Sequence, residues 1–151
     1  MKKFQYSLQT VLNYKNMVLD QKKEEYASWQ AKIEAKNREI AALEQKKRDL
    51  ENAFDDVKHH GAVIEKFLLF AQMIDGTDEE IKYQYKLLAR LQKKADMKKK
   101  EVIAAHIDVS KFEKLREKKL AEYRFAEQKE NEAFIEEFVQ NASARESGAG
   151  A

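Results

Sequence analysis

Histidines are the side chains of this chain best suited to chemistry near neutral pH, as metal ligands or as proton donors and acceptors. The sequence has three, His59, His60 and His106, and no cysteine. A zinc site needs three or four ligands, and adjacent residues on a helix point about 100° apart. Even with Asp55 or Asp56 as a further ligand, His59 and His60 would form at most a weak site. We expect these two at a solvated helix end, and His106 partly buried and hydrogen-bonded.

Other motifs that carry catalysis are absent from the sequence. It contains no glycine-rich phosphate loop and no Gly-x-Ser-x-Gly turn. Carboxylates are plentiful, but an enclosed site must shift the pKa of a carboxylate before it can act as an acid or base, and a two-stranded coil offers no such site. The sequence therefore predicts a protein that binds partners, with no enzymatic activity, no cofactor and no metal.

The elements that position these residues are indicated by composition. Charged residues make up 37% of the 151 residues, while the chain has 4 glycines and no proline. Because tight turns need residues of that kind, the chain can reverse direction only once or twice, which favours long helices. A hydrophobic fraction of 43% with 10% aromatic residues argues against intrinsic disorder.

The balance of positive and negative charge argues against some classes of partner. The net charge is +2, from 29 basic and 27 acidic residues that are intermixed along the chain. Such a chain has no concentrated basic region of the kind that binds nucleic acid or a membrane surface. No apolar run approaches the roughly 20 residues of a membrane span, and no signal peptide follows Lys2 and Lys3. We expect a soluble, cytoplasmic protein.

Apolar positions recur every seven residues over the first 57 residues. The two rows of this repeat are Leu12, Leu19, Tyr26, Ile33, Ile40, Lys47 and Phe54, and Leu8, Lys15, Lys22, Trp29, Lys36, Leu43, Leu50 and Val57. A second seam follows with Ile81, Gln84, Leu88, Leu91, Ala95, Lys98, Val102, Ala105, Val109 and Phe112. A repeat kept for about seven heptads is typical of a coiled coil. Lysines in the seam can lay their methylenes along it and keep their ammonium groups in water, which indicates loose packing.

Two breaker regions lie between the seams, at residues 59–61 and 75–78. A reversal at either would make an antiparallel hairpin, and the sequence does not choose between them. Thr77 followed by Glu80 is a capping-box pattern, so a helix is predicted to start near Asp78. The strongly apolar stretch 62–74 forms either a short helix folded back on the coil or a surface for a partner.

The expected fold class is all-α, a long two-helix antiparallel coiled coil (a helical hairpin), with a short apolar helix near the turn as one version of it. The hairpin covers residues 1–142. After about Asn141 the sequence loses its periodicity and consists mainly of Ala, Ser, Arg and Gly. A disordered tail is therefore predicted over 143–151.

Two motifs in the chain carry a family resemblance. One is Phe-Gln-Tyr-Ser-Leu-Gln-Thr-Val-Leu-Asn-Tyr at residues 4–14, and the other is Lys-Phe-Glu-Lys-Leu-Arg-Glu-Lys-Lys at residues 111–119. Tyr123 and an acidic stretch at 127–137 follow the second motif. In this order and at this distance they resemble the flagellar type III export protein family FliJ, and the resemblance covers nearly the whole chain except the tail.

The middle of the chain agrees with this resemblance at one place and departs from it at another. Gly61 followed by the spaced residues Phe67, Phe70 and Ile74 is similar to the family pattern. The breaker at 75–78 is a departure, because the resemblance implies a helix that runs on there.

The resemblance implies an antiparallel coil similar to the central stalk subunit of rotary ATPases. The end that holds both termini would enter the ring of the flagellar export ATPase and promote its assembly. The other part would engage the cytoplasmic domain of the export gate and help to hand over export chaperones with their cargo. The protein would then be cytoplasmic and peripheral at the inner face of the cell membrane, held there through its partners.

Two sets of residues are candidates for these contacts. Four cations in the second motif are candidates for the ATPase: Lys111, Lys114, Arg116 and Lys118. Five residues near the turn, with more apolar area than a seam requires, are candidates for the gate: Leu43, Leu50, Phe67, Phe70 and Ile74. The simpler interpretation of the second motif is that Phe112 and Leu115 pack on Leu8 and Leu12.

Two other functions remain open from the sequence. A generic structural coiled coil would self-associate through its seams as a parallel dimer. A nucleic-acid-binding helical arm would show affinity that falls steeply with salt.

Overall fold

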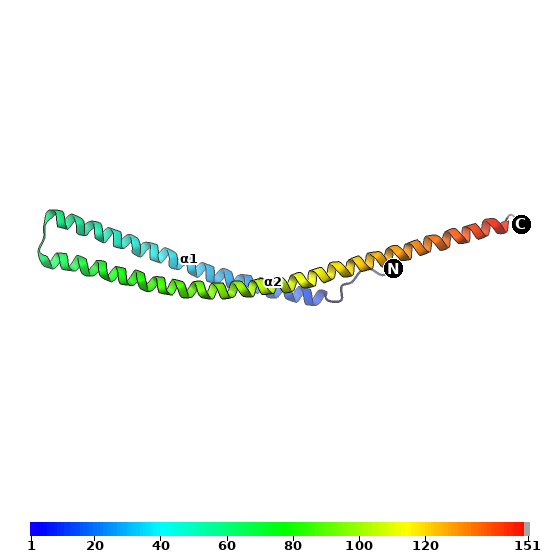
Figure 1. The fold of residues 1–151 in the computed structure, drawn as a ribbon, viewed down its shortest axis with the longest axis horizontal. Helices are drawn as coiled ribbons and strands as arrows, with labels where there is room; N and C mark the ends of the chain where they lie inside the picture. The colour runs from blue at the N-terminus through cyan, green and yellow to red at the C-terminus, as the bar shows by residue number, and fades with distance from the viewer. Residues whose placement is uncertain (150–151) are drawn as a thin grey trace. The chain divides into compact units, whose positions relative to one another are not determined.

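The computed structural model describes residues 1–149, which form two helices, α1 (Gln9–His60) and α2 (Ile64–Ala149) (Figure 1). The helices pack as an antiparallel hairpin, and the described residues contain no strand, so the predicted fold class is confirmed. The chain divides into unit 1, made of Met1–Leu19 and Ala105–Ala151, and unit 2, made of Asp20–Ala104.

The reversal lies in unit 2 at residues 61–63, the first of the two predicted places. Gly61 has φ 78°, a left-handed conformation that costs glycine little and other residues more. Its N–H donates to the Val57 carbonyl at 2.9 Å, which is the bond that closes a left-handed helix C-cap. Lys58 occupies the last turn of α1 together with His59 and His60, and its positive charge complements the helix dipole.

The second breaker region does not interrupt the fold, and the prediction of a helix start near Asp78 is wrong. Residues 75–78 lie inside α2, and 64–74 form its first turns with no separate short helix. The Thr77 hydroxyl donates to the Met73 carbonyl at 2.8 Å instead of capping a new helix. Thr77 is 7% exposed because its position falls in the seam. The capping-box pattern arose from a seam position, and α2 runs on as the family resemblance implied.

The core of unit 2 follows the predicted seams. Ile40 is 3% exposed, and it is joined in the buried layer by Ile81, Leu88, Ala95 and the polar Gln84. Every α1 seam position between 22 and 57 is either buried or intermediate in exposure, and none is classed as exposed. A stripe of seam residues covered by one facing helix is the packing that a two-helix coil provides.

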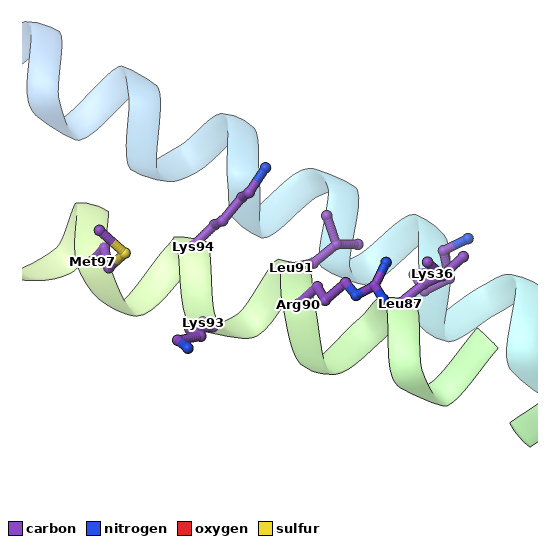
Figure 2. Close-up of a pocket in the computed structure, with 7 residues that line it drawn as sticks. All are labelled: Lys36, Leu87, Arg90, Leu91, Lys93, Lys94 and Met97. Carbon is purple, nitrogen blue, oxygen red and sulfur yellow. The ribbon is translucent and has the colours of Figure 1, made fainter. Parts of the chain in front are cut away.

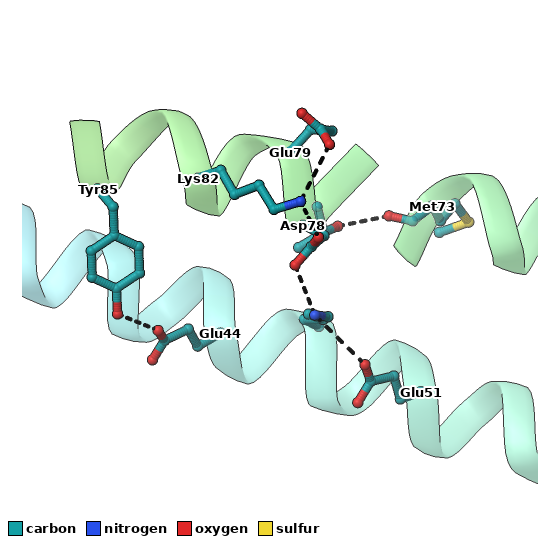
Figure 3. Close-up of polar contacts among 9 residues, drawn as sticks. Glu44, Glu51, Met73, Asp78, Glu79, Lys82 and Tyr85 are labelled. Carbon is teal, nitrogen blue, oxygen red and sulfur yellow. Dashed lines mark hydrogen bonds and ion pairs between the residues drawn. The ribbon is translucent and has the colours of Figure 1, made fainter. Parts of the chain in front are cut away.

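Seam lysines in unit 2 cross to the other helix. The Lys47 ammonium lies 2.8 Å from the Asp78 carboxylate, Lys22 lies 3.5 Å from Glu101, and Lys36 donates to the Gln84 amide oxygen at 2.7 Å. Figure 3 shows Asp78 also beside Lys82 of its own helix, with a separate bond from Tyr85 to Glu44. These polar pairs favour one register of the antiparallel pair, because a shifted seam would leave them unmatched.

Unit 1 holds the N-terminal segment against α2. The Tyr6 hydroxyl donates to the Phe112 carbonyl at 2.9 Å, and the Tyr123 hydroxyl donates to the Lys2 carbonyl. The Phe4 and Tyr123 rings lie 5.6 Å apart. The N-terminal segment is therefore ordered by packing on α2 before α1 begins at Gln9.

The N-terminal amine of unit 1 reaches α2 as far as Glu130, at 3.7 Å, and the part of α2 after Glu132 has no covered residue. All its residues from Ala133 to Ala149 are exposed. The segment predicted as a disordered tail is helical here through Ala149, and residues 150–151 lie outside the described ones. With no tertiary packing, the order of this segment in solution depends on helix propensity alone, so the disorder of 143–149 stays a prediction.

Candidate functional site

The basic cluster of unit 1 consists of Lys111, Lys114, Arg116 and Lys118, and all four side chains are exposed. Residues three, four and seven apart share a helix face, so the three lysines lie along one face of α2. Arg116 lies to another side, 5.9 Å from the Phe4 ring. Among residues 1–149, the ion pairs of unit 1 use the N-terminal amine, Lys15, Lys119 and Lys129, and none of the four cations of the cluster takes part in one.

The apolar residues of the same motif face inward. Phe112 and Leu115 are partly buried, as is Leu8, while Leu12 is buried. Arg116 also lines a shallow groove of about 390 Å³ with Leu12, Gln9 and two glutamates. The two interpretations of this motif are thus compatible, because its apolar positions pack in unit 1 while its cations point outward.

At the turn end of unit 2, the two predicted phenylalanines pack on α1. The Phe54 ring lies 6.0 Å from Phe67, edge on, and 5.7 Å from Phe70, stacked. The Lys58 ammonium lies 4.0 Å above the Phe54 ring. Phe67, Phe70 and Ile74 are all intermediate in exposure, so each offers a partner only part of its surface.

Leu43 and Leu50, the other two predicted gate residues, line one groove of about 270 Å³. The opposite wall comes from α2 and includes Met73, Gly76 and Thr77. This groove brings together residues from both helices near the turn. Met73 belongs to the same surface, although the sequence did not single it out.

The most exposed apolar side chains near the turn are not the predicted ones. Val63, Ile64, Leu68 and Leu69 are each more than half exposed, Leu68 at 56%. The available signal was the spacing of Ile64 and Leu68, four residues apart and beside the seam rather than in it. They add an uncovered apolar surface next to the phenylalanine cluster.

A further groove, which sequence reasoning missed, is lined by side chains of both helices in unit 2 (Figure 2). It has a volume of about 550 Å³ and is lined by Lys36, Leu87, Arg90, Leu91, Lys93, Lys94 and Met97. Beside it, the Trp29 ring carries two ammonium groups, Lys32 at 4.2 Å and Lys94 at 5.1 Å. The sequence alone does not indicate this surface, because its cations come from both helices and are brought together only when the helices pack.

The titratable groups show structural ion pairing. A hydrogen bond from Lys98 lowers the pKa of Glu25 and of Glu101, and one from Lys47 lowers the pKa of Asp78. These shifts favour the charged form, whereas a general acid at neutral pH needs a raised carboxyl pKa. Within residues 1–149, no group of three or more His, Cys, Asp or Glu side chains is placed to hold a metal ion.

The histidines fall in two different settings. His59 and His60 are exposed at the end of α1, and His60 Nδ1 lies 2.8 Å from the Asp56 carbonyl oxygen. His106 is exposed, so the expectation of a partly buried His106 is wrong. Its neighbour Ala105 takes the seam position and His106 points away from it.

The family comparison covers nearly the whole chain. A family model described as "Flagellar FliJ protein" matches residues 4–148, which include both motifs and the turn. The chain belongs to the FliJ family. This FliJ-family protein is therefore a component of flagellar protein export.

No curated protein and no solved structure matches the chain. No helix in the described part of this FliJ-family chain is long and apolar enough to cross a membrane.

Proposed function

We propose that this chain binds the flagellar export ATPase through unit 1 and the cytoplasmic domain of the export gate through the turn end of unit 2. In doing so it promotes assembly of the ATPase ring and delivers export chaperones with their cargo. The observation that carries this proposal is the family match over residues 4–148. The protein acts peripherally at the inner face of the cell membrane, through these partners.

The ATPase contact is assigned to the basic cluster of unit 1. Lys111, Lys114 and Lys118 present three exposed cations along one face of α2, and none of them is paired with a carboxylate of residues 1–149. Such a row attracts an acidic surface over a distance comparable to the Debye length, about 8 Å at physiological salt. A contact of this kind holds a helix inside a ring without requiring one tight pocket.

Charge reversal tests the ATPase contact. Lys114→Glu with Arg116→Glu should weaken ATPase binding at least about tenfold at physiological salt, as is typical when buried or clustered charge pairs are lost. Because Arg116 also packs near Phe4, Lys111→Glu with Lys118→Glu provides a second variant that disturbs no packing.

The matched control reverses two exposed lysines of unit 2, Lys23→Glu with Lys99→Glu. Binding is measured by titration of the labelled ATPase at low and physiological salt. If the control and the cluster variants bind equally well, the assignment of the basic cluster is refuted.

The gate contact is assigned to the groove of Leu43 and Leu50 together with the exposed apolar side chains at the turn. Leu68 and Leu69 are each more than half exposed, so truncating them should leave the coil intact. Phe67 and Phe70 are partly covered by Phe54 and contribute both to the coil and to the surface.

Alanine variants separate surface from core. Leu68→Ala with Leu69→Ala, and Leu43→Ala with Leu50→Ala, should each reduce gate binding while the far-UV helical signal remains. Phe67→Ala with Phe70→Ala should abolish gate binding, and a loss of helicity in that variant would assign both rings to the core alone. Ile103→Ala, which is half-exposed in the same unit, is the control and should bind as the original chain does.

A further inference from the structure

The groove between Lys36 and Met97 in unit 2, here called the basic groove, has an apolar floor and a cationic rim. Leu87 and Leu91 lie on the floor, and the rim comes from Arg90, Lys93 and Lys94 on α2. In Figure 2 Leu91 points toward α1, whereas Lys93 points away from it. A floor of this kind is suited to apolar side chains, and its rim is suited to carboxylates.

The rim of the basic groove is short of carboxylates. Lys36 pairs with Glu39 at 2.9 Å. The other ion pairs of unit 2 involve Lys22, Lys47, Lys58, Lys82 and Lys98, so Arg90, Lys93 and Lys94 have no carboxylate partner among residues 1–149. Lys94 and Lys32 lie over the Trp29 ring instead. The groove is therefore positively charged and uncompensated.

The C-terminal part of α2 carries the complementary surface. Phe134, Ile135, Phe138 and Val139, here called the C-terminal stripe, recur at one, four and five residues and so lie on one side of the helix. All are exposed, Phe134 at 70%. Four large apolar side chains on one uncovered helix face exceed the scattered exposure that is ordinary for a protein surface.

Carboxylates flank the C-terminal stripe on both sides. Glu130 and Glu137 lie next to Phe134, Glu132 lies next to Ile135, and Glu136 lies next to Val139, by helical spacing. Glu136 and Glu137 take part in none of the ion pairs of residues 1–149, whereas Glu130 pairs with the N-terminal amine and Glu132 with Lys129. The segment is thus an acidic amphipathic helix whose apolar face is exposed.

We propose that the C-terminal stripe of one copy of this chain docks in the basic groove of a second copy. The apolar side chains fill the floor between Leu87 and Met97, and Glu136 and Glu137 meet the cations of the rim. The charges decide the pairing, because two stripes facing each other would bring like-charged carboxylates together. Glu136 and Glu137 take no part in the ion pairs of residues 1–149, so their carboxylates are available to the rim of a second copy.

The size of the contact predicts a weak association. Two or three aromatic or aliphatic side chains and a few ion pairs bury less than the roughly 1,200 Å² of a stable interface. A dissociation constant on the order of tens of micromolar follows, and it should rise with salt. Each copy has one groove and one stripe, so reciprocal dimers or head-to-tail chains are both allowed by symmetry.

The test uses the full chain and a charge swap. Sedimentation equilibrium between about 5 and 500 μM brackets the expected dissociation constant. Arg90→Glu with Lys93→Glu, and separately Glu136→Lys with Glu137→Lys, should each weaken self-association at least about tenfold. The fourfold variant that carries both changes should regain it, since the rim and the stripe are again complementary. All four residues are exposed, and circular dichroism checks that each variant remains helical.

Trp29, the single tryptophan, reports on the groove directly. Its emission should change with protein concentration in the original chain and in the fourfold variant. It should stay constant in the two variants that change only the rim or only the stripe. An original chain that stays monomeric to 500 μM overturns the proposal. So does self-association that the swaps leave unchanged, which would assign the contact to the seams or to another surface. Neither readout involves an export protein, so the outcome is independent of the proposed function.

Discussion

Unit 2 and the C-terminal part of α2 share a helix and a similar composition, yet they use their apolar residues in opposite ways. In unit 2 the residues Ile81, Leu88 and Ala95 are buried against α1, and lysines of the seam reach carboxylates of the other helix. Past Tyr123, Phe134 and Phe138 are exposed and face no described segment. The difference indicates that the fold requires the first set, while the second set is available for binding.

The largest expected difference between these regions is in hydrogen exchange. Amides of residues 81–95 should be protected by several orders of magnitude, because they open only when the hairpin unfolds. Amides of residues 134–149 should exchange almost freely, because an isolated helix of this length is marginal in water. Exchange measured by mass spectrometry at low micromolar concentration checks this. Equal protection in both regions would contradict the view that the C-terminal part is unpartnered.

The next largest difference between the two regions is expected in the loss of unfolding free energy when an apolar side chain is truncated to alanine. Leu88→Ala removes a buried side chain of the seam and should cost about 2–4 kcal/mol of unfolding free energy. Phe138→Ala removes a larger side chain that is 67% exposed, and should change stability by less than about 0.5 kcal/mol. Urea denaturation followed at 222 nm gives both values. A comparable loss in the two variants would show that Phe138 is packed.

Alanine substitution of two glycines in unit 2 should change the stability of the hairpin in opposite directions. Gly61→Ala places a side chain at φ 78° and should destabilise the hairpin by about 1–2 kcal/mol. Gly76→Ala lies inside α2, where an added Cβ meets nothing within 4 Å, and should stabilise it by about 0.5–1 kcal/mol. Thermal melts of the two variants decide this. Destabilisation by Gly76→Ala would mean that α2 needs flexibility at this residue.

The smallest expected effect is on acid stability. Hydrogen bonds from Lys47 and Lys82 lower the pKa of Asp78 below its ordinary value of about 3.9. A lowered pKa in the folded state stabilises the hairpin above the unfolded pKa, and this contribution is lost as the pH falls through the folded pKa. Asp78→Asn should therefore lose less stability than the original chain between pH 7 and pH 2.5. Asp75→Asn, at an exposed residue in the same turn of α2, is the control. Identical losses in all three chains would refute the pairing.

The heptad repeat made most of unit 2 predictable from the sequence. Ile40, Leu88 and Ala95 were placed in the seam by spacing alone, and each is buried. The choice of turn was not predictable, because residues 59–61 and 75–78 carry the same kind of breaker. Tertiary packing decided it: Thr77 is covered by α1, and its hydroxyl bonds within α2.

The surfaces were harder to predict than the core. The apolar excess near the turn predicts Phe67 and Phe70 as gate residues, yet Phe54 covers part of both. Leu68 and Leu69, which are not among the predicted residues, are more exposed. Heptad spacing identifies the residues that two helices share. It does not identify grooves such as the one at Leu87, whose lining depends on which side chains of α1 and α2 lie opposite one another.

The most direct test of the account is ATP hydrolysis by the purified cognate export ATPase with and without this chain. The account predicts stimulated hydrolysis together with ring formation seen by electron microscopy, and both should be reduced by Lys114→Glu with Arg116→Glu but kept by Lys23→Glu with Lys99→Glu. An unchanged rate and no rings at saturating concentrations of the chain would contradict it.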